Sequence, residues 1–95
     1  MNDKQRELAR HALGLPNKRN QSYRNYFCLG ADGDGYSDWE DLVAKGLAVK
    51  RKTALCGGMD YFHLTLKGAL MVREPKEHLS QEDTKMMREM EVVQS

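Results

Sequence analysis

The feature that most constrains the fold is a change of hydrophobic period after Gly46. Apolar and polar side chains alternate over residues 47–52 and alternate again over residues 61–65. A period of two is typical of half-buried β-strands. Between the two segments, Gly57 and Gly58 tolerate the positive φ angles of a tight turn. The sequence therefore predicts two antiparallel strands joined by a glycine turn.

Two helices are predicted before this hairpin. Asn2 and Gln5 have the spacing of a capping box, and Gly14 supplies a left-handed stop, so we expect a helix over residues 3–13. A second helix is expected over residues 38–45, where acidic side chains in the first turn complement the positive end of the helix dipole. Apolar residues recur at helical spacing in both segments.

The second helix follows a glycine-rich loop, residues 30–36. Ser37 is expected to cap this helix, with Glu40 completing a capping box. Residues 30–41 also resemble the spacing of a calcium-binding EF-hand loop, but Gly30 brings no carboxylate to the first position. We therefore interpret the loop as a capping turn and expect neither a metal nor a cofactor.

Residues 22–29 fit two structures. Tyr23, Tyr26 and Phe27 share one face of a helix, whereas residues 26–29 equally fit a buried strand. We favour a short helix and interpret the three aromatic side chains as core material.

Two more helices are predicted after the hairpin. Thr65 is expected to cap residues 66–74, with Leu70 and Met71 turned inward. Ser80 is expected to cap a last helix whose apolar stripe docks on the domain, frays or pairs with a second copy of the chain as a homodimer. That stripe consists of Met86, Met87, Met90 and Val93.

A chain of 95 residues is long enough for one core and too short for two. We expect an α+β domain at residues 1–75 followed by a C-terminal helical tail at residues 76–95. No nucleophile motif, metal-ligand spacing or paired catalytic carboxylates occur, so an enzyme is the least expected class. With 15 basic and 14 acidic residues, any binding to nucleic acid must be local.

The two cysteines, Cys28 and Cys56, have apolar neighbours and form no C-x-x-C pair, so we expect buried free thiols. The first residues are charged and the apolar runs are short. We therefore expect a cytoplasmic protein with no membrane partner.

Two resemblances extend this picture. Residues 42–51, with the run Lys-Gly-Leu, and residues 63–70, with Leu-Thr-x-x-Gly, resemble the recognition-helix end, the second strand and the strand-to-helix junction of MarR-type winged-helix regulators. This resemblance implies a winged helix-turn-helix-like domain in which the hairpin is the wing. Residues 10–68 also resemble small proteins of bacteriophages and prophages, which implies a bacterial host cell as the setting.

Charge is segregated along the chain. Acidic residues gather in the glycine-rich loop and the helix after it, and basic residues gather on the hairpin. The candidate surface for a partner protein is Asp32, Asp34, Asp38, Glu40 and Asp41. The candidate surface for nucleic acid is Lys45, Lys50, Arg51, Lys52, Tyr61, His63 and Lys67. Alternation is expected to place Lys50 and Lys52 with Tyr61 and His63 on the outward strand face.

Three function classes follow. The first is a protein-interaction module that modulates or inhibits a bacterial host complex, for example a defence system, through the acidic helix and basic hairpin. The alternative is a winged-helix transcriptional regulator that contacts DNA through the basic wing, and a third class is a small structural or assembly component. We rank the interaction module first because three acids lie on the helix that a regulator would place in the major groove.

Overall fold

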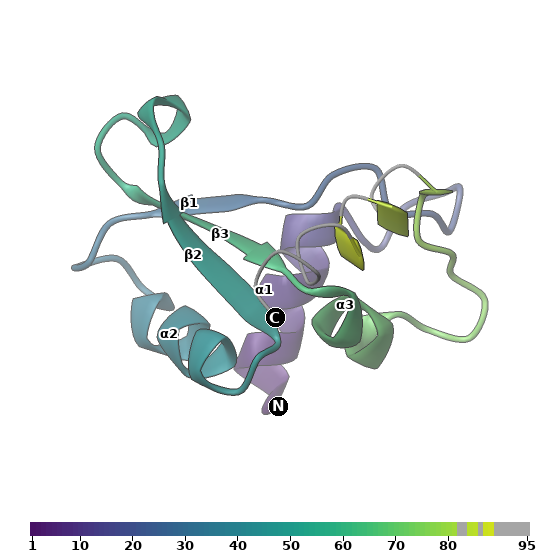
Figure 1. Cartoon of the computed structure of the whole chain (residues 1–95). Coiled ribbons are helices and arrows are strands. Elements are labelled where there is room, and N and C mark those ends of the chain that lie inside the picture. The colour runs from purple at the N-terminus through teal and green to yellow at the C-terminus, as the bar shows by residue number, and fades with distance from the viewer. Residues whose placement is uncertain (82–83, 86, 89–95) are drawn as a thin grey trace.

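The computed structural model describes residues 1–81, 84–85 and 87–88 of the chain. The described elements follow the order α1 (Asp3–Leu13), β1 (Phe27–Leu29), α2 (Tyr36–Ala44), β2 (Ala48–Lys52), the 3-10 turn η1 (Ala54–Cys56), β3 (Asp60–Leu64) and α3 (Leu66–Val72). Three helices and a three-stranded antiparallel sheet form a small α+β fold (Figure 1). The expected α+β class and the hairpin after the second helix are confirmed.

The sheet has the strand order β1-β3-β2, so β3 is its central strand. β1 adds to the predicted hairpin in antiparallel register, with Phe27 opposite Phe62. In the connection between β2 and β3, Gly57 and Gly58 adopt φ angles of 57° and 93°. The expected glycine turn is therefore confirmed.

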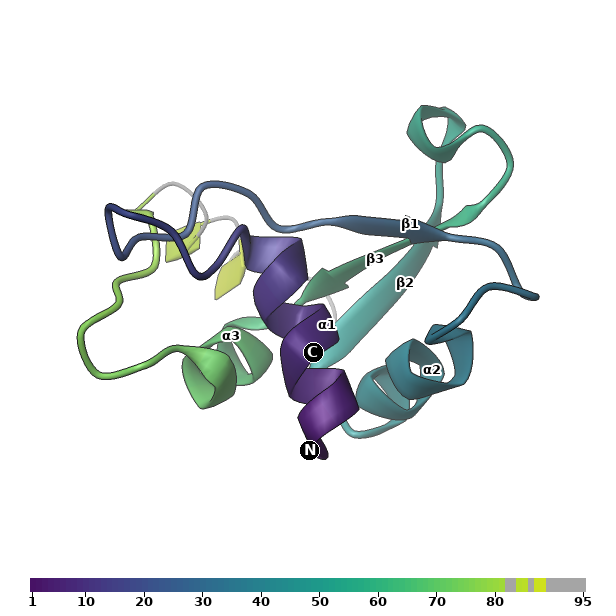
Figure 2. The same ribbon diagram turned by 180° about the vertical axis from the view of Figure 1, so that it is seen from behind.

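The hydrophobic core lies between the helices and one face of the sheet. Figure 2 shows α1 in front of that face, and Figure 1 looks onto the opposite face. Trp39 of α2 is fully buried; its ring centroid lies 5.4 Å from that of Phe62 and 5.6 Å from that of Phe27. Aliphatic residues of all three helices complete this core, among them Leu13, Leu42 and Val72.

Three local helix signals are confirmed. Asn2 accepts a hydrogen bond from the backbone of Gln5, whose side chain accepts one from the backbone of Asn2, and Gly14 ends α1 with a φ of 80°. Thr65 caps α3 by accepting a hydrogen bond from the backbone N–H of Gly68 at 3.2 Å. These signals involve residues close in sequence, which is why the sequence was enough to predict them.

Two other helix expectations are wrong. α2 begins at Tyr36, one residue after Gly35 with a φ of 95°, so Ser37 lies inside the first turn and does not cap it. The ring of Tyr36 packs edge-on against a core ring of β3, which favours the earlier start. In α3, Leu70 and Met71 are 51% and 48% exposed. The inner positions are taken by Gly68, Ala69 and Val72.

Residues 22–29 do not form the short helix that we favoured. Residues 22–26 have no regular structure and lead into β1, because Phe27 pairs with β3 and packs against the core. Tyr23 and Tyr26 are 64% and 47% exposed. Of the three aromatic residues expected in the core, only Phe27 packs against it.

Cys28 and Cys56 form a disulfide bond, so the expectation of free thiols is wrong. Their Cα atoms lie 5.5 Å apart although the residues are 28 positions apart in sequence. The pairing of β1 with β3 brings them together. The bond ties β1 to the tip of the β2–β3 hairpin.

The chain after α3 returns to the loop that precedes β1. The backbone N–H of Ser22 donates to the carbonyl of His78 at 2.9 Å, next to a parallel bridge between Gln21 and His78. Met87 is 1% exposed and belongs to the core cluster. The other stripe residues, Met86, Met90 and Val93, lie outside the described residues, so the domain boundary and the dimer stay predictions. Within the described part of the chain, no helix has the length and apolar character needed to cross a membrane.

Candidate functional site

Carboxylates of the predicted acidic surface are paired with lysines from neighbouring elements. Asp34 accepts a hydrogen bond from Lys4 of α1 at 2.8 Å, and this contact raises the pKa of Lys4. Glu40 of α2 pairs with Lys50 of β2 at 3.3 Å and raises the pKa of Lys50. These pairs join α1 to the loop before α2, and α2 to the sheet.

Asp41 has two partners. Lys45, one turn later, donates at 2.8 Å, and Gln5 of α1 donates at 2.7 Å; these two donors, Lys45 first, lower the pKa of Asp41. The buried Gln5 also donates to the carbonyl oxygen of Asp38 at 3.2 Å. Within the described residues, the side chains of Asp32 and Asp38 have no hydrogen-bond or ion-pair partner. Three of the five acidic side chains are therefore already paired within the fold, in exposed contacts that each contribute little to stability.

The register of β2 separates the basic residues of the hairpin. Lys50 lies opposite Phe62, whereas Arg51 lies opposite Tyr61. Residues directly opposite each other in antiparallel strands share a face of the sheet, so Lys50 and Lys52 are on the helix side. The expectation that these two lysines face outward is wrong. Arg51 is the hairpin cation on the outer face.

The remaining hairpin cations are dispersed. Lys52 pairs with Asp60 at 3.1 Å, and Asp60 also accepts a hydrogen bond from the hydroxyl of Tyr36. The Tyr36 hydrogen bond is the larger cause, and Lys52 the second, of the lowered pKa of Asp60. Lys67 is exposed in the first turn of α3, with no partner among the described residues. The predicted nucleic-acid set therefore does not form one surface.

His63 shares the outer strand face with Tyr61, as expected, but it is buried, with 3% of its surface exposed, so its expected exposure is wrong. Burial lowers the pKa of its imidazole, and the positive charge of Arg51 acts in the same direction. At neutral pH the ring is therefore uncharged. It lies on the same face of β3 as Tyr61, with the two ring centroids 5.9 Å apart.

The outer face of the sheet carries a group of aromatic and cationic side chains that we call the tyrosine–arginine face. It consists of Arg24, Tyr26, Arg51 and Tyr61. The ring of Tyr26 stacks on that of Tyr61, with centroids 6.1 Å apart and planes 11° apart. The guanidinium of Arg24 lies over the Tyr26 ring at 6.0 Å. Three of the four side chains come from the sheet or from the residue just before β1.

Two anchors hold this face in place. The side-chain amide of Asn25 donates to the carbonyl of Leu64 at 2.9 Å and accepts from its N–H at 2.8 Å, which extends the pairing of β3 beyond β1. Arg24 donates to the carbonyl oxygen of His11, in the last turn of α1, at 2.8 Å. The sequence analysis missed this face because it placed Tyr26 in the core; alternation from the core residue Phe27 is the signal that locates it.

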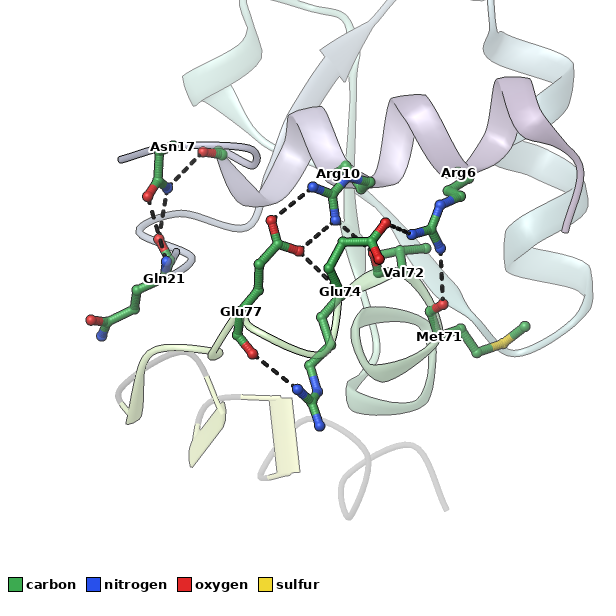
Figure 3. Close-up of polar contacts among 10 residues, drawn as sticks. Arg6, Arg10, Asn17, Gln21, Met71, Val72, Glu74 and Glu77 are labelled. Atoms are coloured by element: carbon green, nitrogen blue, oxygen red, sulfur yellow. Dashed lines mark hydrogen bonds and ion pairs between the residues drawn. The ribbon is translucent and has the colours of Figure 1, made fainter. Parts of the chain in front are cut away.

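A charged cluster between α1 and the chain after α3 was also missed (Figure 3). Arg10 donates to both carboxylate oxygens of Glu77, at 2.6 and 2.8 Å, and to the carbonyl of Val72 at 2.8 Å. One turn earlier, Arg6 pairs with Glu74 at 2.5 Å. Glu77 is 1% exposed, and the Arg10 guanidinium lowers the pKa of its carboxyl. This cluster fastens the segment after α3 to α1.

Comparison with protein-family models, curated proteins and solved structures finds no match for this chain. Within the described residues, no group of three or more His, Cys, Asp or Glu side chains is placed to hold a metal ion.

Proposed function

We propose that this chain is a non-enzymatic protein-interaction module that binds a partner protein through the tyrosine–arginine face. The observation that carries the proposal is the stacked pair Tyr26 and Tyr61, flanked by Arg24 and Arg51 on the sheet face opposite the core. Tyrosine and arginine are the side chains most enriched at the energetic centres of protein interfaces. Hydrogen bonds of Asn25 and Arg24 already fix the residues just before β1, so little conformational entropy is lost there on binding.

The face also suggests the chemistry of the partner. Arg24 and Arg51 offer donors and positive charge, and no acidic residue belongs to the face. A partner that presents carboxylates or backbone carbonyls beside an aromatic or aliphatic side chain is complementary to it. The resemblance to phage and prophage proteins makes a bacterial host complex the first place to look, with modulation or inhibition of that complex as the proposed outcome. Of the acidic residues expected to be the contact surface, Asp34, Glu40 and Asp41 are already paired with lysines of the chain.

The test is affinity capture from bacterial lysate with a matched set of variants and quantitative mass spectrometry. Tyr26→Ala and Arg51→Glu should each lose the protein that the wild type enriches. Lys67→Glu, which reverses an exposed cation on α3, should retain it. Loss of that protein with Asp38→Lys but not with Arg51→Glu would transfer the interface to α2 and overturn the proposal.

A second candidate is the winged-helix DNA-binding regulator. The order β1-β3-β2 with a β2–β3 hairpin directly after α2 favours it. Two observations weigh against it: the helix expected at residues 22–29 is replaced by an extended segment and β1, and Glu40 and Asp41 lie on the helix that would approach phosphates. Gel-shift titrations at two salt concentrations distinguish the candidates. Sequence-specific binding at physiological salt that is lost in Arg51→Glu and retained in Tyr26→Ala would favour the regulator.

A further inference from the structure

A second site lies beside the tyrosine–arginine face, where the loop after α1 meets the chain after α3. Its volume is about 510 Å³, within the range of small-ligand pockets. We call it the loop pocket. It is lined by Asn17, Lys18, Arg19, Gln21, Ser22, Tyr23 and Ser80. In the described part of the chain, no acidic side chain lines it.

Hydrogen bonds of Asn17 and Ser22 hold the walls of the loop pocket. The side-chain amide of Asn17 donates to the carbonyls of Gly14 at 3.0 Å and Gln21 at 2.7 Å, as Figure 3 shows. Its oxygen accepts the backbone N–H of Arg19 at 3.0 Å. On the other side, the hydroxyl of Ser22 accepts the backbone N–H of Ser80 at 2.9 Å. The loop is therefore organised before any ligand arrives.

The cations of the loop are not used by the fold. Lys18 and Arg19 are exposed, and among the described residues their side chains have no ion-pair or hydrogen-bond partner. The lysines near α2, in contrast, are paired with carboxylates. Two adjacent cations that line one pocket, without partners among the described residues, are suited to an anion, and a guanidinium next to an ammonium suits phosphate in particular.

One wall of the loop pocket is an aromatic ring in a defined position. Tyr23 is 64% exposed, yet its ring is held: Arg24 lies over it at 5.3 Å. The other contact is with Gly14, where a Cβ atom would come within 2.2 Å of the Tyr23 Cε1 atom. A fixed, exposed ring beside two cations offers a stacking surface for a planar base next to a phosphate site.

We propose that the loop pocket binds a nucleotide, with its phosphate on Lys18 and Arg19 and its base against Tyr23. The nucleotide can be a free mononucleotide or the phosphorylated end of a nucleic-acid strand, because both present the same group. The proposal does not rest on the protein-interaction function: Lys18, Arg19 and Tyr23 lie outside the tyrosine–arginine face, and the test needs only the purified chain and one small ligand.

The test is calorimetric titration of the full chain with AMP at constant ionic strength, with adenosine and inorganic phosphate as separate ligands. AMP should bind saturably and more tightly than either fragment. The Lys18→Gln/Arg19→Gln double variant should bind AMP at least about tenfold more weakly, because charge-assisted hydrogen bonds are lost. Tyr23→Leu should weaken AMP but leave phosphate binding unchanged. The matched control, Lys67→Gln, removes an equally exposed cation elsewhere and should bind like the wild type.

A single-stranded oligonucleotide with a 5′-phosphate identifies the source. If the oligonucleotide binds more tightly than AMP, the natural ligand is the end of a strand; if the two affinities are equal, it is a free nucleotide. No saturable AMP binding, equal affinity for adenosine and AMP, or the same loss in Lys67→Gln as in the double variant would each overturn the site. Circular dichroism of the variants shows that the fold is intact, and because these are exposed side chains we expect no change.

Discussion

The Arg10–Glu77 pair provides the sharpest test of how the segment after α3 is held. We consider Arg10→Met, which keeps an unbranched side chain on α1 and removes the charge. Glu77 then loses both of its guanidinium contacts, at 2.6 and 2.8 Å, and keeps the backbone N–H of Glu74 at 2.7 Å. The carboxylate is 1% exposed, so an unpaired charge would be left in a poorly hydrated site.

The size of the effect follows from this burial. Breaking a buried ion pair by removing one partner costs about 3–5 kcal/mol. The Arg10 side chain is 14% exposed, so water can enter part of the space that it vacates, and we expect a value near the lower limit, about 3 kcal/mol. The control is Arg6→Met, one turn earlier, whose pair with Glu74 has side chains 36% and 47% exposed. That exposed pair should contribute less than about 1 kcal/mol.

The assay is urea denaturation followed by the fluorescence of the buried Trp39. The free energy of unfolding of a small domain falls by roughly 2 kcal/mol per molar urea. Arg10→Met should therefore lower the urea concentration at the unfolding midpoint by about 1.5 M, and Arg6→Met by less than about 0.5 M. Equal, small shifts in both variants would refute the reasoning.

Acid provides a second check: Arg10 holds the pKa of Glu77 below its usual value, so this stabilisation is present above about pH 4.3. The stabilisation should be lost as the pH falls through the lowered pKa of Glu77, and the free energies of unfolding of the wild type and Arg10→Met should converge at that pH.

Three further predictions use the same unfolding assay. Replacing Cys28 and Cys56 by Ser should cost about 3–4 kcal/mol, the loop-closure value for their separation, and a loss below about 1 kcal/mol would argue against the bond. The pKa of His63 is lowered by burial, so stability should fall as the pH drops below about 6.5, and His63→Phe should reduce that slope. Gly14→Ala should cost about 1 kcal/mol more than Gly46→Ala, because both have positive φ but only the former places a methyl group against an aromatic ring, which must shift.

The sequence predicted those elements whose signals are local. The cap at Asn2, the stop at Gly14 and the cap at Thr65 each depend on contacts within four residues, and all three are confirmed. Ser37 shows the limit of the same reasoning. Its spacing to Glu40 fits a capping box, but Gly35 allows the chain to enter the helix earlier, and Tyr36 is then placed to pack on the sheet.

Features that depend on the assembled sheet could not be predicted in this way. The pairing of Cys28 with Cys56 requires β1 to add beside β3, and β1 was interpreted as helix. The face of each hairpin residue depends on register, in which a shift of one position exchanges the two sides. Lys50 was therefore placed on the wrong side, and Arg51, on the outer face beside Tyr61, was not distinguished from it.

Together, the pairings change where recognition is expected on this molecule. In the sequence, acids and bases form two separate blocks, which suggests two opposed binding surfaces. In the fold, Glu40 of α2 meets Lys50 of β2, so the two blocks face each other across the packing of α2 on the hairpin, while Lys52 pairs with Asp60 inside the hairpin. A partner that competed for those charges would have to break contacts that hold α2 to the sheet. Arg51 has no ion-pair partner among the described residues, so a charged partner at the proposed interface on the outer face would break no ion pair of the fold.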